Sequence, residues 1–449
     1  MGAIRIQDTL SGQAREVRPD ARGEVGIYAC GPTVYGRIHI GNARPYVVFT
    51  LLKRFLEHEG LNAKLVINVT DINDKIYDAA TEIGEPSDEY AAEMTAAYVA
   101  DTDALGLERP DAEPLASGTI EEIISLIQSL IDSAHAYQAN GDVYFRVRSF
   151  DEYGKLSNRD PEDMDQGEEA GTAALKEDPL DFALWKGHKE GEDTSWDSPW
   201  GKGRPGWHIE CSAMSEKELG PDFTIHGGGI DLVFPHHENE IAQTEAARGV
   251  PLAEIWMHNG LVQIDEEKMS KSVGNIFQLS EAIERYGGQT VVAYLISGHY
   301  RQPLAFSDEQ LQQTVAGIER IRNYFRDAPS GEAGEFLRDR RQAFLGALAD
   351  DFNTPQAFAV LFEIVAEGNR RELPGARETL GELLPLLGLD SLIDEEEEAP
   401  AEVLALLEER EKARGSKAFD RADELRDELA RMGWEVRDEA GGARLVRRR

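Results

Sequence analysis

The residues best suited to chemistry gather in one stretch, Gly206 to Glu240, which reads GWHIECSAMSEKELGPDFTIHGGGIDLVFPHHENE. Pro235 suits the first turn of a helix, because its missing N–H would be unpaired there anyway. On such a helix His236 and Glu240 lie four residues apart, so their side chains leave the same face and one metal ion could bind both. The candidate metal ligands of the stretch are Cys211, His226, His236, His237, Glu238 and Glu240.

A set of four ligands needs a second thiol. The chain has 2 cysteines in 449 residues, and the one outside this stretch is Cys30, at the end of an apolar run. Two thiolates, one imidazole and one carboxylate suit zinc, and here they would come from Cys30, Cys211, His236 and Glu240. Two alternatives stay open: the cysteines are buried apolar residues, or they form a disulfide. A chain without a secretory signal disfavours the disulfide.

The expected helix would turn His237 and Glu238 to its opposite face. Residues in such positions more often form a solvated surface, or lie behind the ligands, than bind the metal themselves. We therefore leave both residues out of the predicted site.

A second group of polar residues follows Val262-Gln-Ile-Asp265. Residues 265–275 read DEEKMSKSVGN and place Lys268, Ser270, Lys271 and Ser272 in a loop. Lysines and hydroxyls in a mobile loop can grip phosphate oxygens. The alternative is an ordinary solvated loop, which any isolated lysine–serine run would be.

A parallel α/β sheet is expected to position both groups. Residues 24–30 and 64–70 are apolar enough for buried strands, and a glycine-rich loop and a helix over 45–59 separate them. Such sheets bind ligands at the carboxyl ends of their strands. The loop lacks the G-x-G-x-x-G spacing of dinucleotide enzymes, which disfavours that class. A second strand, loop and helix are expected at 223–226, 227–231 and 235–248.

The remaining segments follow from hydrophobic spacing and turn residues. We expect helices over 86–105 and 118–135, a hairpin at Asn140-Gly141, an acidic, turn-rich insertion over 159–198, helices throughout 307–390, and a helix pair at 402–414 and 417–432 followed by a short strand.

The charge balance is extreme, with 84 acidic against 47 basic residues and a net charge of −37. Taken alone, it argues against a nucleic-acid partner, which usually meets a basic surface. The acids are spread along most of the chain, however, which favours adaptation to a salt-rich cytoplasm where screening shortens repulsion. The net charge therefore does not exclude a nucleic-acid partner. We expect a cytoplasmic protein of two to four domains, because neither a signal pattern nor an apolar run of ~20 residues is found.

Several short motifs together carry a resemblance to a known family. His39-Ile40-Gly41-Asn42 resembles the His-Ile-Gly-His signature of class I aminoacyl-tRNA synthetases, and Lys268 to Ser272 matches their Lys-Met-Ser-Lys-Ser signature. Four further motifs narrow the resemblance from this class to one family: Cys-Gly-Pro-Thr-Val-Tyr, Gly-Trp-His-Ile-Glu-Cys-Ser, His-Gly-Gly-Gly-x-Asp-Leu and Phe-Pro-His-His-Glu-Asn-Glu. From end to end the chain looks like the cysteinyl-tRNA synthetase family. Asn42 departs from the signature; asparagine still donates a hydrogen bond but carries no charge.

The resemblance implies a Rossmann-type parallel sheet with an insertion, a C-terminal helical bundle and a small α+β anticodon-binding unit. The implied parts are the first half of the catalytic domain at 1–115, a connective insertion at 116–200, the second half at 201–258, a stem-contact region at 259–312, the bundle at 313–392 and the anticodon-binding domain at 400–449.

The implied reaction is attack of the cysteine carboxylate on the α-phosphorus of ATP, followed by transfer of the cysteinyl group to tRNA(Cys). Positioning and charge neutralisation dominate such catalysis. The implied catalytic residues are His39, Asn42, Lys268 and Lys271. ATP, with Mg²⁺, would contact these four residues and also Gly41, Gly229, Asp231 and Ser270. L-cysteine would contact Gly31, Thr70, Trp207 and His226, although each could equally be a packing residue, and a tryptophan such as Trp207 is more often a core aromatic than a ligand contact.

Zinc would explain how cysteine is chosen over serine. An apolar pocket separates near-isosteres by only about 1–3 kcal/mol, whereas zinc binds a thiolate strongly and an alcohol poorly. One Zn²⁺ per chain is therefore implied, with a monomer as the family expectation. The alternatives are a purely structural zinc, a cysteine ligase of thiol biosynthesis that joins cysteine to an amino sugar, and a catalytically silent zinc- or tRNA-binding paralogue.

Overall fold

The computed structural model describes residues 2–160, 162, 175–264, 267–268, 277–393, 400–416, 418–432, 434–439 and 442–447. The chain divides into two compact units, Met1–Leu389 and Asp390–Arg449. Each unit has a hydrophobic core of its own.

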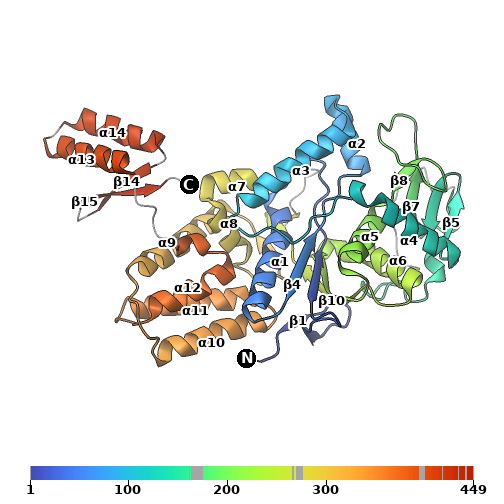
Figure 1. The fold of residues 1–449 in the computed structure, drawn as a ribbon, viewed down its shortest axis with the longest axis horizontal. Helices are drawn as coiled ribbons and strands as arrows, with labels where there is room; N and C mark the ends of the chain where they lie inside the picture. Colours follow the sequence, from blue (N-terminus) through green and yellow to red (C-terminus); the bar gives the residue numbers. More distant parts are fainter. Residues whose placement is uncertain are drawn as a thin grey trace. The chain divides into compact units, whose positions relative to one another are not determined.

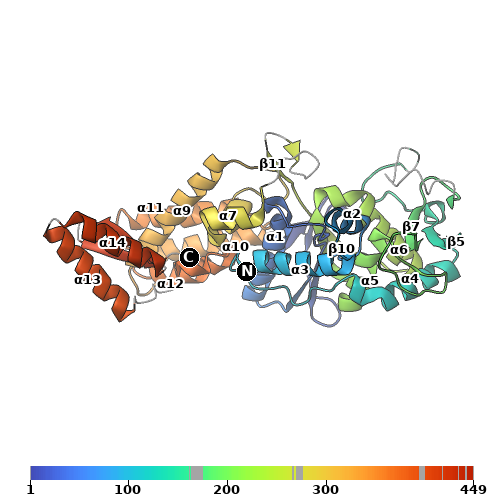
Figure 2. The same cartoon turned by 90° about the horizontal axis from the view of Figure 1, so that it is seen from above.

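Four parallel strands form the centre of the first unit, and their order is β10-β9-β3-β4. Every residue of β3 is buried, as expected for a parallel strand covered on both faces. Helix α1 lies on one side of the sheet, and α5 and α6 lie on the other (Figures 1 and 2). The predicted parallel α/β sheet is confirmed. Its strands are β3 (Val25–Ala29), β4 (Ala63–Ile67), β9 (Phe223–Gly229) and β10 (Ala253–Asn259).

Helix α1 (Ile40–His58) begins at Ile40 rather than at Pro45, where the sequence pattern placed its start. His39 caps the helix: its Nδ1 accepts from the Asn42 N–H at 3.2 Å, and the Asn42 Oδ1 accepts from the His39 N–H at 3.2 Å. This reciprocal cap satisfies two donors of the first turn, which allows the helix to begin before the proline. His39 to Asn42 therefore form a helix N-terminus and not a loop.

The second strand–helix unit also starts differently from the prediction. Residues Val233–His237 form a five-residue π-type turn with a cis peptide bond between Phe234 and Pro235. Helix α6 (Glu238–Arg248) follows, so Pro235 precedes the helix instead of occupying its first turn. Helix α5 (Trp207–Leu219) carries Cys211 and packs beside α6 (Figure 1).

The insertion between α4 and α5 forms an antiparallel sheet in the order β5-β6-β7-β8. The predicted hairpin at Asn140-Gly141 is confirmed, and both residues have positive φ, as a two-residue hairpin turn requires. The expected turn-rich insertion over 159–198 also contains a strand that the sequence pattern missed, β7, whose Phe182, Leu184 and Trp185 are fully buried. The strands are β5 (Ala136–Ala139), β6 (Asp142–Phe145), β7 (Phe182–Gly187) and β8 (Gly203–Pro205).

Other elements complete the first unit. A short hairpin consists of β1 (Arg5–Gln7) and β2 (Ala14–Glu16), and α2 (Asp74–Ile83), α3 (Ser87–Asp103) and α4 (Ile120–Asp132) precede the insertion. Beyond β10 come β11 (Val262–Ile264), β12 (Glu267–Lys268), α7 (Leu279–Tyr286), α8 (Gly288–Leu295), β13 (Leu304–Ala305), α9 (Asp308–Asp327), α10 (Glu335–Ala349), α11 (Thr354–Gly368) and α12 (Ala376–Leu383).

The second unit is small and α+β. Its elements are α13 (Ala401–Gly415), α14 (Phe419–Arg431) and the hairpin of β14 (Trp434–Glu439) and β15 (Gly442–Arg447). Its core includes Val403, Leu429, Trp434, Val436 and Leu445. In the described parts of both units, no helix has the length and apolar character needed to span a membrane.

Candidate active site

A cleft of about 880 Å³ opens at the carboxyl ends of the parallel strands in the first unit. Its lining comes from the loop after β3, the first turns of α1 and α2, the insertion strand β7, the start of α5 and the segments after β9 and β10. Sheets of this kind bind ligands at this edge, because loops from several strands meet there. Among the predicted site residues, Cys30, Gly31, His39, Gly41, Asn42, Trp207, Gly229 and Asp231 line the cleft.

The four predicted metal ligands come together beside this cleft. One donor atom from each of Cys30, Cys211, His236 and Glu240 lies within 4.8 Å of the others. The Cys30 Sγ lies 3.6 Å from the Glu240 Oε1, and the His236 Nε2 lies 3.0 Å from the same oxygen. All four residues are buried. The two cysteines are free thiols and form no disulfide with each other.

Burial opposes charge throughout this cluster. It raises the pKa of the Cys30 thiol and of the Glu240 carboxyl, and it lowers the pKa of the His236 imidazole. A bound divalent cation would reverse this balance by stabilising two thiolates and a carboxylate. Two sulfurs, one nitrogen and one oxygen in reach of one point are a donor set that fits a tetrahedral metal.

A second group of four ligands overlaps the first. It shares Cys30 and Glu240 and adds His226 and His237. The His226 Nε2 lies 2.8 Å from the Glu240 Oε2, and the His237 Nε2 lies 3.4 Å from the Cys30 Sγ. Of the two positions expected for His237, a solvated surface or a place behind the ligands, the first is wrong, because its side chain is fully buried and touches a predicted ligand.

Glu238 is also buried, so the solvated surface is excluded for this residue too. Its carboxylate accepts the backbone N–H groups of Gly154, Leu156 and Ser157 at 3.0, 3.3 and 2.7 Å. The first residue of α6 thereby fastens a loop of the insertion onto the helix that carries the predicted ligands. The i,i+4 spacing predicted the geometry of His236 and Glu240, but it carried no information on what packs against the helix from outside.

Histidines that sequence reasoning left out surround the cluster. The His208 Nδ1 lies 2.9 Å from the His236 Nδ1, and the His258 Nε2 lies 2.8 Å from the His237 Nδ1. Burial lowers the pKa of His208 and of His258 to about 3, so both are neutral near pH 7. His208 could have been suspected from its place in Gly-Trp-His-Ile-Glu-Cys, whereas nothing local marks His258.

The residues predicted to bind cysteine take different positions. Trp207 is 38 % exposed, and its ring centroid lies 4.4 Å from that of His236, so it forms a wall next to the cluster. A Cβ at Gly31 would lie 1.8 Å from the Asn68 carbonyl oxygen, so only glycine fits this close approach. Thr70 and His226 are buried behind the lining, and the Thr70 hydroxyl accepts from the Asn68 amide at 3.1 Å.

The structure describes only some of the residues that were predicted to bind phosphate. His39 and Asn42 lie at the N-terminus of α1, where the helix dipole favours anions. Gly229 ends β9 and Asp231 lies in the following turn. Lys268 lies in β12, while Ser270 and Lys271 fall outside the described residues.

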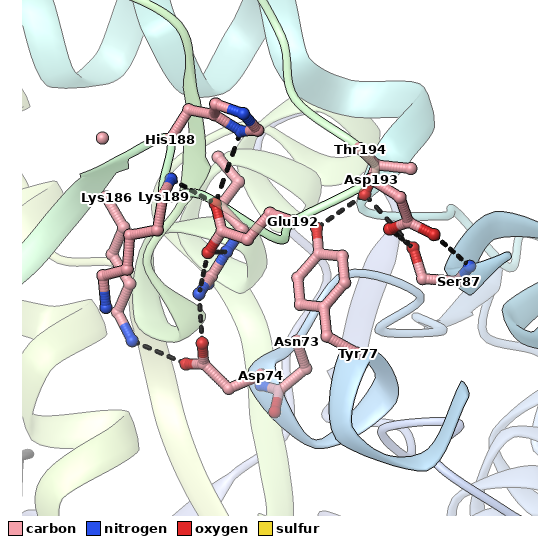
Figure 3. Close-up of polar contacts among 12 residues, drawn as sticks. Asn73, Asp74, Tyr77, Ser87, Lys186, His188, Lys189, Glu192, Asp193 and Thr194 are labelled. Atoms are coloured by element: carbon pink, nitrogen blue, oxygen red, sulfur yellow. Dashed lines mark hydrogen bonds and ion pairs between the residues drawn. The ribbon is translucent and has the colours of Figure 1, made fainter. Parts of the chain in front are cut away.

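Beside α2 and β7, the cleft wall is built from ion pairs (Figure 3). The Lys186 ammonium lies 2.7 Å from the Asp74 carboxylate, and Arg204 donates to Asp74 and, at 3.2 Å, to Glu192. Burial acts to raise the pKa of Asp74, but Arg204 and Lys186 hold it below its ordinary value. This network joins α2 to the insertion, and the spacing of these residues in the sequence did not predict it.

Hydrogen bonds extend the same junction away from the cleft. The Tyr77 hydroxyl lies 2.7 Å from the Thr194 hydroxyl, and the Asp193 carboxylate accepts from the Ser87 N–H at 2.7 Å (Figure 3). The start of α3 is thereby tied to the same loop of the insertion.

The fold and the catalytic region are shared with known proteins. Residues 16–316 match the family model of the class I (C) tRNA synthetase catalytic domain, and residues 343–389 match the DALR domain. In fold the chain is similar to methionyl-tRNA synthetase of Mycobacterium tuberculosis, with a TM-score of 0.59, 15 % identity and coverage of 82 % and 90 % of the two chains. The protein is thus a class I aminoacyl-tRNA synthetase in fold and catalytic domain.

Full-length relatives narrow the class. The chain is 44 % identical to the cysteine–tRNA ligase of Caldicellulosiruptor saccharolyticus over 464 residues, covering 99 % of this chain and 100 % of that one. It is 43 % identical to the enzyme of Brevibacillus brevis over 468 residues, covering 99 % and 100 %. Residues 396–445 match the cysteinyl-tRNA ligase anticodon binding domain. The chain belongs to the cysteinyl-tRNA synthetase family, and the predicted family and fold class are confirmed.

Proposed function

We propose that the protein activates L-cysteine with ATP and transfers the cysteinyl group to tRNA(Cys). The observation that carries this proposal is the group Cys30, Cys211, His236 and Glu240 beside a cleft at the carboxyl ends of the parallel strands. A class I catalytic domain supplies adenylate chemistry, and the buried donor set supplies a means of recognising a thiol. The amino-sugar ligase is disfavoured, because residues 396–445 match an anticodon binding domain.

We assign the four-ligand group to zinc. When bound, zinc would favour the substrate thiol as a thiolate ligand and would bind the serine hydroxyl poorly. Cys30 and Cys211 offer sulfur, His236 nitrogen and Glu240 oxygen, a combination typical of zinc. His226 holds the second oxygen of Glu240, which fixes the direction of the carboxylate. Selection at this step would make a separate editing reaction unnecessary.

The cap of α1 prepares two donors for the triphosphate. Because the His39 Nδ1 and the Asn42 Oδ1 serve the cap, the His39 Nε2 and the Asn42 Nδ2 are the atoms that can donate to phosphate. Asn42 thus offers one hydrogen-bond acceptor and one donor, as the second histidine of the His-Ile-Gly-His signature does, but it carries no charge. Lys268, Ser270 and Lys271 are proposed to contact the β- and γ-phosphates, with Mg²⁺ accompanying the nucleotide.

Gly31, Thr70, Trp207 and His226 remain the proposed cysteine-binding residues. Gly31 and Trp207 would contact the amino acid directly, since both line the cleft. Thr70 and His226 would act from behind, by holding Asn68 and Glu240 in place.

The 3′ end of the tRNA is proposed to enter along the wall formed by α2 and β7. This wall carries Lys75, Lys186 and Lys189, and the Lys75 ammonium lies 5.3 Å from the ring centroid of Tyr35. Basic groups next to aromatic rings suit a single-stranded RNA end, because they offer phosphate contacts and a stacking surface. In the described part of the chain the Lys189 ammonium makes no ion pair, and Lys186 is held by Asp74.

Charging of total tRNA with labelled cysteine tests the proposal. Serine is the parallel substrate, and the reaction is run in 0.1 M and in molar potassium chloride. Stable attachment of cysteine without serine is expected. Cysteine-dependent pyrophosphate release without charging would point to a thiol ligase, and no reaction would leave a silent paralogue. The salt series also tests the predicted salt adaptation, for which faster charging in molar salt is expected. A monomeric state and a cytoplasmic location stay predictions.

A further inference from the structure

One buried side chain on the cleft has no hydrogen-bond partner among the described residues. Asn259 is the last residue of β10, lines the cleft and is 1 % exposed. In the described part of the chain, neither its amide oxygen nor its amide nitrogen has a hydrogen-bond partner. A buried amide without protein partners is rare, and leaving it unpaired costs free energy. Such a group is explained most directly by a ligand that supplies the missing partners.

The direction of this side chain follows from the register of the sheet. Asn259 pairs with Gly229, and Met257 pairs with Gly227. A Cβ at Gly227 would lie 2.2 Å from the Phe49 ring, so the side chains of this pair point toward α1. Alternate residues of a strand share a face, so Asn259 also projects toward α1. Its neighbour on that face is Gly229, where a Cβ would lie 2.4 Å from the Asp231 Oδ1, so a carboxylate rather than an apolar side chain borders this part of the cleft.

The backbone around Asn259 is held firmly. The N–H of Gly260 donates to the Tyr300 carbonyl at 2.8 Å, and buried Arg44 donates to the Gly260 carbonyl at 2.6 Å. A Cβ at Gly260 would lie 2.3 Å from the Gln302 carbonyl, so the chain passes close behind. The amide is therefore presented from a fixed support, which reduces the entropy cost of binding.

We propose that Asn259 binds the adenine edge of ATP, with its amide oxygen accepting from the N6 amino group and its amide nitrogen donating to the neighbouring ring nitrogen. An amide offers one donor and one acceptor side by side, and adenine offers their complement. Hypoxanthine replaces the N6 donor with an acceptor and breaks this match. The inference rests on the proposed function for the presence of ATP in the cleft.

Nucleotide affinity tests the assignment directly. ATP, ITP and 2′-deoxy-ATP are titrated into the intact protein, without cysteine or tRNA, for the wild type and for Asn259→Ala. The wild type is expected to bind ATP about ten- to a hundredfold more tightly than ITP, the range of a good bidentate base contact. Asn259→Ala should lose that factor for ATP and for 2′-deoxy-ATP while leaving ITP unchanged. Equal loss for ATP and ITP, or no loss at all, overturns the inference.

Thermal unfolding separates a ligand contact from a structural one. Because the amide has no partner among the residues that the structure describes, Asn259→Leu should unfold at the same temperature as the wild type or higher. The control is Asn239→Leu, since the Asn239 amide oxygen is fully buried and accepts from the Tyr153 hydroxyl. The control should unfold at a lower temperature. A matching drop for Asn259→Leu would assign Asn259 a structural role and overturn the inference.

The two proposals fail in different ways. If the wild type prefers ATP over ITP through Asn259 but charges no tRNA with cysteine, the proposed function fails and the nucleotide contact stands. If cysteine is charged normally and Asn259→Ala binds every nucleotide as the wild type does, the contact alone fails.

Discussion

The two ends of the cleft handle charge in opposite ways. At the metal-ligand end, burial drives Cys30, His236 and Glu240 toward their uncharged forms, and no described lysine or arginine forms an ion pair with Glu240. At the α2–β7 end, Asp74 keeps its charge because Lys186 and Arg204 hold it. The first arrangement has the donor atoms of a metal site, and the second is a network of opposite charges that neutralise one another. If the proposed function is right, thiol selection and tRNA binding rely on different electrostatics within one cleft.

Replacing Cys211 by serine should have the largest effect and tests the metal-ligand end. Loss of a group that only hydrogen-bonds to a metal ligand typically costs about 10–100-fold in metal affinity or activity. Loss of a ligand itself should therefore reduce cysteine-dependent pyrophosphate exchange by about a hundredfold or more. Metal content should fall as well, while ATP affinity stays close to that of the wild type. Ser215→Ala is the matched control, because this buried hydroxyl on the same helix bonds only to a backbone carbonyl. Equal losses of cysteine and ATP binding would contradict the assignment of Cys211.

Asn42 lines the same cleft from the first turn of α1, and two substitutions separate its functions. Asn42→Asp keeps the oxygen that caps α1 but removes the donor, so adenylate formation should fall by about a hundredfold while thermal stability is retained. Asn42→His restores an acceptor and a donor and should recover most of the rate. Pyrophosphate exchange and thermal unfolding measure the two effects. Full activity of Asn42→Asp would show that Asn42 only caps α1 and does not assist adenylate formation.

Lys186→Ala tests whether the ion-paired end binds tRNA. The KM for tRNA should rise about fivefold, the size expected for one partly exposed charge contact, with cysteine-dependent pyrophosphate exchange unchanged. Lys64→Ala is the control, because Lys64 also forms an ion pair, with Glu218 at 3.3 Å, but does not line the cleft. An unchanged KM for tRNA, or an equal rise in the control, would leave the α2–β7 wall without a role in tRNA binding.

The smallest effect is expected for Asp74→Asn, which tests the charge at that end. The pKa of folded Asp74 lies below its ordinary value of 3.8, so its charge stabilises the fold above about pH 4 and this contribution is lost as the pH falls through the folded-state pKa. Because the side chain is 39 % exposed, the loss in Asp74→Asn should stay below about 1 kcal/mol at pH 7 and shrink toward pH 3. Denaturant unfolding at both pH values measures it. A difference independent of pH would show that the ion pairs contribute nothing.

Local patterns predicted much of the fold and part of the site. The apolar run before Cys30 became β3, the spacing of His236 and Glu240 brought their side chains to 3.0 Å, and Asn140-Gly141 formed a hairpin turn. These features depend on neighbours in the chain, which sequence spacing captures. The starts of α1 and α6 were wrong because a reciprocal cap at His39 and a turn before Glu238 outweighed the positions of the prolines.

The sequence by itself determined the chemical types of the ligands, the family and the strand–helix order, because these lie in short motifs and periodicities. Only the tertiary structure decided that Cys30 meets Glu240 across 210 residues and that His237 is buried against His258. It also decided that Asn259 ends its strand with an amide that no described residue pairs. Burial and pairing are properties of the packed sheet, in which loops far apart in the chain converge at one edge, so no local spacing encodes them.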